Sequence, residues 1–253
     1  MRRTKPHAFT IVELMVSIAI IAVLLGILIP VLASARSQAR TTVTLSNLRQ
    51  VGVIFQQYIG RYSETYPFAE RGQWLSLEPN GQSQTLSSTY PFQLRISWPA
   101  LMHEIAPWRE HYSTWVNPGA PIEPGEPWKL RSDAPGTIRD NDPSYHYSHA
   151  FQARPRLFAP NPPTSTDELI TLIRPVRTSD VTHPSSKALL YDAKREYLTR
   201  DPRPTDPRAV LAADGSVVMR LDENATPPIP TPFIGGRGIR YSDTPGGAGG
   251  RDW

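Results

Sequence analysis

Hydrophobic residues are concentrated in one long run near the start of the chain. From Leu14 to Ala35 there are 22 residues without a charge, most of them Ile, Leu, Val or Ala. A helix of about 20 apolar residues is long enough to cross the hydrocarbon core of a bilayer. The pattern therefore predicts a single-pass membrane protein whose transmembrane segment lies within residues 9–35.

A second hydrophobic pattern begins where the first one ends. Between Ser34 and Tyr62 there is no Pro, and apolar residues recur at steps of three and four beside a face of Arg, Gln, Ser and Thr. We expect the helix to continue over residues 36–62 as an amphipathic part that packs on a folded domain. A helix from Phe9 to about Tyr62 is on the order of 80 Å long. The apolar positions of its second half include Leu45, Leu48, Val51 and Phe55.

The clearest strand signals lie late in the chain. Residues 187–193 are typical of a strand, and Asp214-Gly215 is a hairpin turn signal between the apolar segments 209–213 and 216–221. These segments predict an antiparallel sheet. We therefore expect an α+β fold in which the C-terminal half of the long helix packs on a small, loop-rich sheet domain.

Two other regions lack regular patterns. Residues 63–145 contain an Asn80-Gly81 turn signal and repeated Pro and Gly, and they allow no topology to be assigned. Together with the strands they form the predicted extracytoplasmic domain, residues 63–224. The segment 225–253 has five Pro and seven Gly and is predicted to be a disordered tail.

Tryptophan is unusually frequent in the first of these regions. Five Trp side chains are spread through it, and we expect them to cover a shallow core. An exposed aromatic platform that binds sugar is the alternative, and it requires these rings on one open face. The five are Trp74, Trp98, Trp108, Trp115 and Trp128.

Charge and composition restrict the function further. The net charge is +4, but Arg2, Arg3 and Lys5 supply three basic residues, and without them 24 basic residues face 23 acidic ones. Nucleic acid is therefore not an expected partner. Basic residues before the apolar run instead predict that the N-terminus stays in the cytoplasm and that the rest lies outside it.

No catalytic or metal-binding constellation is evident. The chain has no Cys, which excludes disulfides and thiolate metal sites, and it has no phosphate loop, dinucleotide fingerprint or G-x-S-x-G motif. His146 and His149 are three residues apart without a third ligand, and a calcium site around Asp222 to Asn224 has little support. We expect neither an enzyme nor a cofactor.

The residues before the apolar run carry a family resemblance. Residues 8–14, AFTIVEL, followed by the apolar helix, resemble the processing signal of type IV prepilins and type II secretion pseudopilins. The resemblance implies that a prepilin peptidase and methyltransferase cuts between Ala8 and Phe9 and methylates the new N-terminus at Phe9. Residues 1–8 are then the cytoplasmic leader peptide. The family usually has Gly where this chain has Ala8, so we expect slower cleavage.

Two further features of the segment fit the same family. Glu13 is a carboxylate at the edge of the apolar run, and the resemblance implies that it receives the N-terminal amine of a neighbouring subunit and sets the register of assembly. The alternative is that Glu13 only reaches the lipid headgroups. Pro30 removes the donor for the carbonyl of Gly26, so the pair marks a kink, or else a Pro that the membrane helix tolerates.

The resemblance is also close over residues 47–52, NLRQVG, and on to Tyr66-Pro67, which are similar to a stretch of pseudopilin-like proteins. It extends weakly to segments within residues 144–221, up to Ala213–Val217, which resemble a region associated with prepilin processing. That region is named for a His ten residues before the Asp-Gly pair, and this chain has Pro204 there. The role of that His does not transfer.

The resemblance implies a pseudopilin-like structural subunit that assembles with other pilin-like subunits into a type II secretion or type IV pilus-like filament. Its location would be the bacterial inner membrane, with the C-terminal domain in the periplasm. A non-assembling membrane-anchored binding module is the alternative. A soluble enzyme released by signal peptidase after the Ala33-Ser34-Ala35 site is a third hypothesis.

Overall fold

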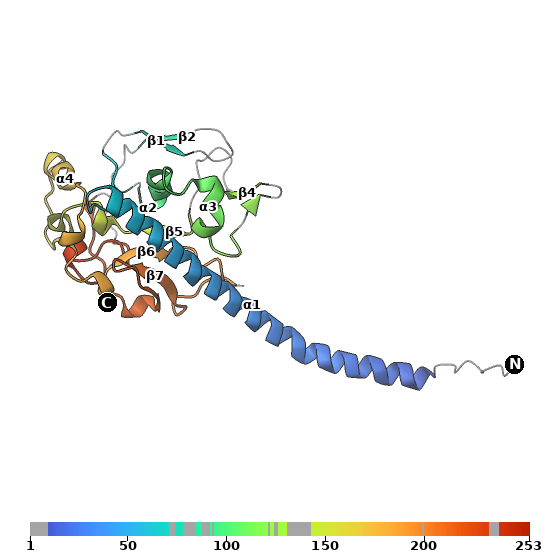
Figure 1. Cartoon of the computed structure of the whole chain (residues 1–253). Coiled ribbons are helices and arrows are strands. Elements are labelled where there is room, and N and C mark those ends of the chain that lie inside the picture. Colours follow the sequence, from blue (N-terminus) through green and yellow to red (C-terminus); the bar gives the residue numbers. More distant parts are fainter. Residues whose placement is uncertain are drawn as a thin grey trace. The chain divides into compact units, whose positions relative to one another are not determined.

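The computed structural model describes residues 10–70, 74–77, 84–87, 92, 94–120, 122–123, 126–130, 143–198, 200–232 and 238–253. The chain divides into two units, Met1–Ala39 and Arg40–Trp253. The helix α1, Ile11–Arg61, runs through both of them and contains Pro30. The first unit consists, in its described part, of the apolar half of α1, and the second holds the sheet (Figure 1).

The second unit is built on a four-stranded antiparallel sheet in the order β5-β6-β7-β8. The strand predicted over residues 187–193 is β6, and the predicted hairpin is β7 followed by β8. The second unit also contains two small hairpins and several short helices. The sheet strands are β5 (Tyr145–Tyr147), β6 (Ala188–Asp192), β7 (Arg208–Ala212) and β8 (Val217–Arg220).

The remaining elements are short. The antiparallel hairpins are β1 (Trp74–Leu77) with β2 (Gln84–Ser87), and β3 (Ile122–Glu123) with β4 (Glu126–Leu130). The α-helices are α2 (Leu94–Ser97), α3 (Trp108–Trp115) and α4 (Thr166–Leu172). The 3-10 helices are η2 (Trp98–Met102), η3 (His149–Phe151), η4 (Pro155–Phe158), η5 (Thr178–Asp180), η6 (Pro184–Ser186), η7 (Asp222–Asn224) and η9 (Gly247–Gly249).

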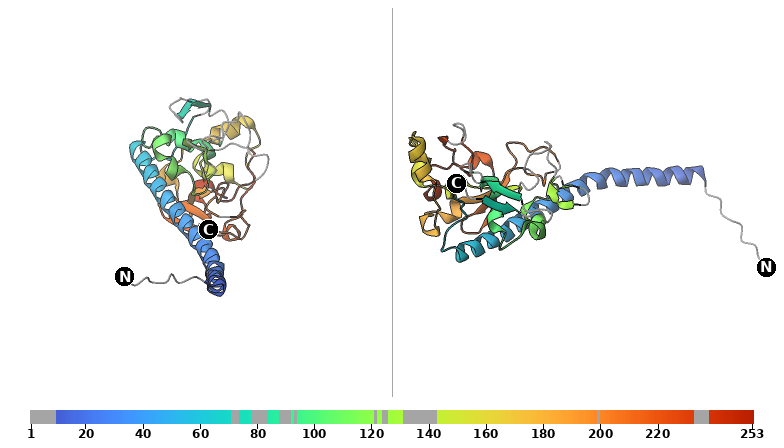
Figure 2. Two further views of the ribbon diagram at one scale, coloured as in Figure 1. Left: turned by 90° about the vertical axis from the view of Figure 1, so that its right-hand side faces the viewer. Right: turned by 90° about the horizontal axis from the view of Figure 1, so that it is seen from above.

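The C-terminal turns of α1 pack on one face of this sheet, as the amphipathic pattern predicts (Figure 2). Leu48, Val51 and Phe55 are fully buried in the main core. The ring of Phe55 lies 5.6 Å from that of Tyr147 in β5, measured between centroids. The helix is therefore fixed to the sheet by its apolar face.

Aromatic side chains fill the rest of this core. The described Trp side chains of the region, Trp98, Trp108 and Trp115, are at most 2% exposed. The indole of Trp98 lies 5.2 Å from the Phe55 ring and donates a hydrogen bond to the carbonyl of Tyr145. These three rings form the core, as expected, and none of them lies on an open face. The side chains of Trp74 and Trp128 are outside the described residues, as is the Asn80-Gly81 turn.

The segment 238–253 covers the opposite face of the sheet. Along β7, Ala209 and Leu211 belong to the core under α1, whereas Val210 belongs to a second cluster with Tyr241. Trp253 also packs against this cluster. The described part of the C-terminal segment is thus a folded layer of the domain, which differs from the predicted disordered tail.

Polar contacts explain why this Gly-rich segment is ordered. The backbone N–H of Asp252 donates to the carbonyl of Ser186, and its carboxylate accepts from the N–H of Ala188 at 2.8 Å. The same carboxylate lies 3.1 Å from the ammonium of the fully buried Lys187. A buried cation requires such a partner, so Asp252 holds the end of the chain in place.

One glycine of α1 controls how closely the helix meets the sheet. A Cβ atom at Gly52 would lie 3.1 Å from Cδ1 of Leu211, whereas a Cβ at Gly60 would meet nothing within 4 Å. Both glycines lie in the same helix, Gly52 on its buried face and Gly60 on its exposed face. They therefore make a matched pair for testing the packing.

We predict that Gly52→Val destabilises the protein by about 1–3 kcal/mol, because the added methyl groups overpack the contact with β7. Gly60→Val should be neutral or slightly stabilising, because Val has a better helix propensity than Gly and meets open space. Urea unfolding of the full chain in detergent micelles measures both. Equal effects of the two substitutions would contradict the close approach at Gly52.

Candidate functional site: the N-terminal half of α1

The N-terminal half of α1 presents apolar side chains on all sides. Sixteen large hydrophobic side chains between Ile11 and Leu32 are each 48–78% exposed. Among the described residues, α1 is the one helix long and apolar enough to cross a membrane. Leaving each such side chain in water costs roughly 1.5–3 kcal/mol, so this surface requires apolar surroundings.

Glu13 is part of the start of this helix. The carboxylate oxygen Oε2 accepts hydrogen bonds from the backbone N–H of Thr10 at 2.9 Å and from its hydroxyl at 2.8 Å. The backbone N–H of Glu13 in turn donates to the Thr10 hydroxyl oxygen at 3.2 Å. This reciprocal arrangement is a capping box, which satisfies N–H groups that a helix start leaves without partners.

The capping role of Thr10 is a feature that the sequence reasoning missed. The signal was present as the pattern Thr-x-x-Glu at Thr10 and Glu13, directly before an apolar run. Glu13 therefore serves the isolated chain as a helix cap, apart from any role toward a neighbouring subunit.

The other predicted residues of this segment are placed as follows. Ala8 and Phe9, on either side of the predicted cleavage site, lie outside the described residues, as do Arg2, Arg3 and Lys5. Gly26 and Pro30 lie within α1, which continues through both positions. A kink at this pair remains a prediction.

The Asp214-Gly215 pair lies in the turn between β7 and β8. Gly215 has a φ of 88°, which favours glycine, and its N–H donates to the carbonyl of Ala212. The carboxylate of Asp214 accepts from the backbone N–H of Ser216 at 2.9 Å. These contacts are those of a structural turn, far in sequence from the N-terminal motif.

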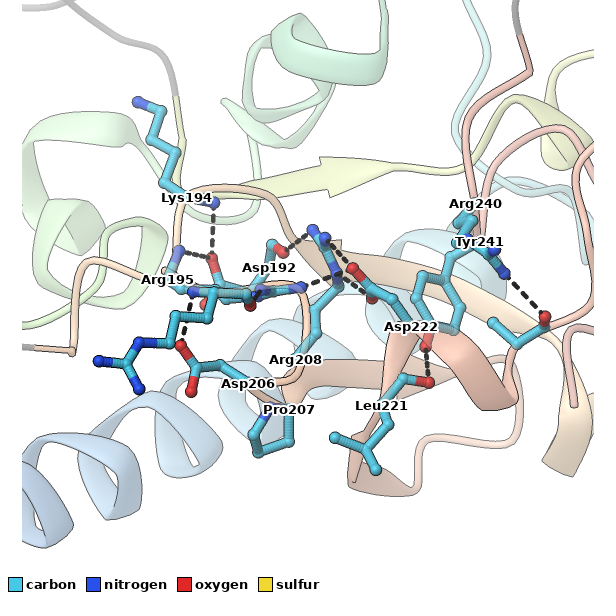
Figure 3. A network of polar contacts seen from close by, with 12 residues as sticks. Asp192, Lys194, Arg195, Asp206, Pro207, Arg208, Leu221, Asp222, Arg240 and Tyr241 are labelled. Carbon is cyan, nitrogen blue, oxygen red and sulfur yellow. Dashed lines mark hydrogen bonds and ion pairs between the residues drawn. The ribbon is translucent and has the colours of Figure 1, made fainter. Parts of the chain in front are cut away.

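Charged residues near this sheet form a connected network, shown in Figure 3. Arg208 binds the carboxylate of Asp222 with two hydrogen bonds of 2.9 and 2.8 Å and donates to the carbonyl of Asp192 at 2.6 Å. Arg195 adds a contact of 2.6 Å to the same carboxylate. Asp222 is thus occupied by two guanidinium groups, which argues against the calcium site considered around it.

The histidines also have structural partners. His149 is buried, and its Nδ1 lies 2.8 Å from the carboxylate of Asp243, which ties η3 to the C-terminal segment. His146 faces Arg95, with 2.6 Å between Nδ1 and the guanidinium. In the part of the chain that is described, no three His, Asp or Glu side chains gather as a metal site.

The residues at the start of α1 are similar to a known family of sequences. Residues 3–29 match the family model of the prokaryotic N-terminal methylation motif. The chain therefore carries the prepilin-type signal, which is processed by prepilin peptidase. No match was found among curated proteins or among solved structures.

The N-terminal motif and the fold are both features of pilin-like proteins. A long apolar N-terminal helix whose second half packs on an antiparallel sheet is the α+β arrangement of pilin-like proteins. This chain combines that arrangement with the methylation motif at residues 3–29 and with a helix long and apolar enough to cross a membrane. Such a motif is a substrate signal carried by structural proteins.

One member of the polar network makes folding depend on pH. Burial raises the pKa of Asp192 to about 6, although backbone N–H groups of Arg195 and Lys194 donate to its carboxylate and oppose the shift. A raised carboxyl pKa means that the ionised form destabilises the folded chain above pH 6. This cost is relieved as the pH falls through 6 toward the ordinary value near 4.

We predict that Asp192→Asn stabilises the folded chain at pH 7 relative to the parent. This advantage should shrink by up to about 3 kcal/mol between pH 7 and pH 4, because each unit of pKa difference corresponds to about 1.4 kcal/mol. Burial also lowers the pKa values of His146 and His149, which destabilises the folded chain as the pH falls. This effect is the same in the parent and in the variant. Urea unfolding at several pH values measures the difference.

The exposed Asp201→Asn variant is the control, because it removes the same charge without burial. A stability difference between Asp192→Asn and the parent that stays constant from pH 7 to pH 4 would refute the burial effect.

Proposed function

We propose that the chain is a pseudopilin-like structural subunit of a type II secretion or type IV pilus-like filament. The observation that carries the proposal is the apolar, exposed surface of α1 between Ile11 and Leu32, most of which lies within the methylation motif at residues 3–29. A membrane covers this surface before assembly, and the helices of neighbouring subunits cover it afterwards. In this proposal the chain functions by associating with other subunits and carries out no chemical reaction of its own.

Processing sets the N-terminus. A prepilin peptidase cuts between Ala8 and Phe9 on the cytoplasmic side of the bacterial inner membrane, and Phe9 is methylated. The basic residues of the leader hold that side in the cytoplasm. The domain that follows α1 then lies in the periplasm. The leader contains the basic residues Arg2, Arg3 and Lys5. After its removal, the amine of Phe9 is the positive charge that remains at the start of the helix.

Glu13 gives the assembly its register. Both hydrogen bonds from Thr10 fall on Oε2, and the carboxylate has a second oxygen, Oε1, with which to meet the amine of an incoming subunit. In surroundings of low dielectric constant, an ammonium and a carboxylate attract each other strongly. The capping box holds the carboxylate at a defined place on the helix, which reduces the entropy lost when the pair forms.

The alternative, a non-assembling binding module, lacks a supporting observation. Its sugar-binding platform needs exposed Trp rings in residues 63–145, and the three that the structure describes there, Trp98, Trp108 and Trp115, are buried. The third hypothesis, a soluble domain released after Ala35, leaves the methylation motif without a purpose. Filament assembly accounts for the motif and the apolar helix together.

We predict that Glu13→Gln leaves membrane insertion and cleavage intact but lowers incorporation into filaments about tenfold or more. Gln preserves the capping box but removes the charge, and loss of one partner of a desolvated charge pair costs 2–5 kcal/mol. Crosslinking between helices in membranes, followed by counting the subunits in each ladder, measures incorporation.

Thr10→Val is the matched control. It removes the capping hydroxyl and keeps the charge, so it should cost about 1 kcal/mol of helix stability and leave incorporation nearly normal. If Glu13→Gln assembles as well as the parent, the carboxylate does not set the register.

A further inference from the structure

Asn224 lies in the chain's single Asn-x-Thr sequence. Of the six Asn residues, only Asn224 is followed, after a residue other than Pro, by Ser or Thr; the sequence there is Asn224-Ala225-Thr226. This tripeptide is the acceptor pattern for asparagine-linked glycosylation of exported proteins, since the hydroxyl two residues on is needed to position the amide. Glycosylation at this tripeptide requires that the Asn lie on the surface of an exported domain.

The structure supplies the surface site. Asn224 is exposed and ends η7, the short turn that follows β8. Its neighbour Ala225 is 5% exposed and packs in the cluster with Tyr191 and Tyr241. The buried Ala225 anchors the turn, while Asn224 remains open to solvent.

The site also lies on the side of the sheet away from the helix. Ala225 shares its cluster with Val210 of β7, whereas Ala209 and Leu211 of the same strand belong to the core beneath α1. Successive side chains of a strand point to opposite faces. A bulky group at Asn224 therefore leaves the contact between α1 and the sheet unobstructed.

Contacts of the next residues indicate when the group is added. The backbone N–H of Thr226 donates to the carbonyl of Asp252 at 2.7 Å, and Asp222 is held by Arg208 and Arg195. An enzyme that binds the tripeptide in an open conformation must act before these contacts form. Transfer to Asn224 would therefore have to take place on the chain during export, before the segment 238–253 docks.

We propose that Asn224 is the acceptor of an asparagine-linked glycan. The donor is a polyprenyl-pyrophosphate-linked oligosaccharide. The amide nitrogen of Asn224 forms a bond to the anomeric carbon, the bond from that carbon to the pyrophosphate oxygen breaks, and the lipid pyrophosphate leaves with the electron pair. The amide gives up one proton to the transferase. This modification rests on the proposed function, because it requires the domain to lie outside the cytoplasm.

Peptide mapping of the full chain from the membrane fraction of its own cells tests the proposal. Trypsin cuts after Arg220 and Arg237, so residues 221–237 form one peptide that contains Asn224. We expect this peptide to carry added sugar masses and to lose them on treatment with an amidase that converts glycosylated Asn to Asp. Recovery of the peptide only at its unmodified mass would overturn the proposal.

Matched variants at Thr226 separate the acceptor pattern from the fold. Thr226→Ser keeps the hydroxyl and should remain glycosylated, whereas the isosteric Thr226→Val and the variant Asn224→Gln should lose the glycan. All three keep the backbone N–H that donates to Asp252. A glycan that persists in Thr226→Val would overturn the assignment. The N-terminal peptide from the same sample reports processing at Phe9, so a failure of anchoring is distinguished from a failure of glycosylation.

Discussion

The whole arrangement depends on keeping the side chains between Ile11 and Leu32 out of water. They surround the helix on every side, and residues 14–35 include no charge that would make the surface tolerable in water. At roughly 1.5–3 kcal/mol for each side chain, their exposure would exceed the whole stability of an ordinary domain. A membrane, or a bundle of equivalent helices, is the environment that satisfies this constraint.

The same helix changes its character after the apolar run. Its later turns bury one face through Leu48, Val51 and Phe55, and Gly52 brings Leu211 of β7 into close contact. The other face of the sheet is covered by a segment without helix or strand of more than three residues, which polar anchors such as Asp252 and Asp243 hold in place. The sheet is therefore enclosed by an apolar helix on one side and a hydrogen-bonded loop layer on the other.

Local patterns were enough to predict the helix and the hairpin. The absence of charge in residues 14–35 and the three- and four-residue steps after Ser34 predicted α1, and Asp214-Gly215 predicted the turn between β7 and β8. Both depend on neighbours in the chain. The N-terminal motif was also readable, because its residues lie within a few positions of one another.

Contacts between distant residues were not predictable in the same way. Asp252 and Lys187 are 65 positions apart, and nothing in the Gly-rich sequence around Asp252 indicates that it meets a buried ammonium. The cap formed by Thr10 is different, because its Thr-x-x-Glu pattern is visible in the sequence, whereas the roles predicted for Glu13 were pairing in assembly and contact with lipid headgroups. Burial of Trp98 and Trp115 was expected, whereas their edge-to-face packing follows from the meeting of η2 and α3.

The mass of the N-terminal peptide, measured on protein recovered from the membrane fraction, tests the central claim most directly. The account predicts a chain that begins with N-methylated Phe9 and retains the apolar half of α1. A chain that begins at Arg36 would contradict it, because cleavage after Ala35 would remove the helix on which membrane anchoring and assembly depend.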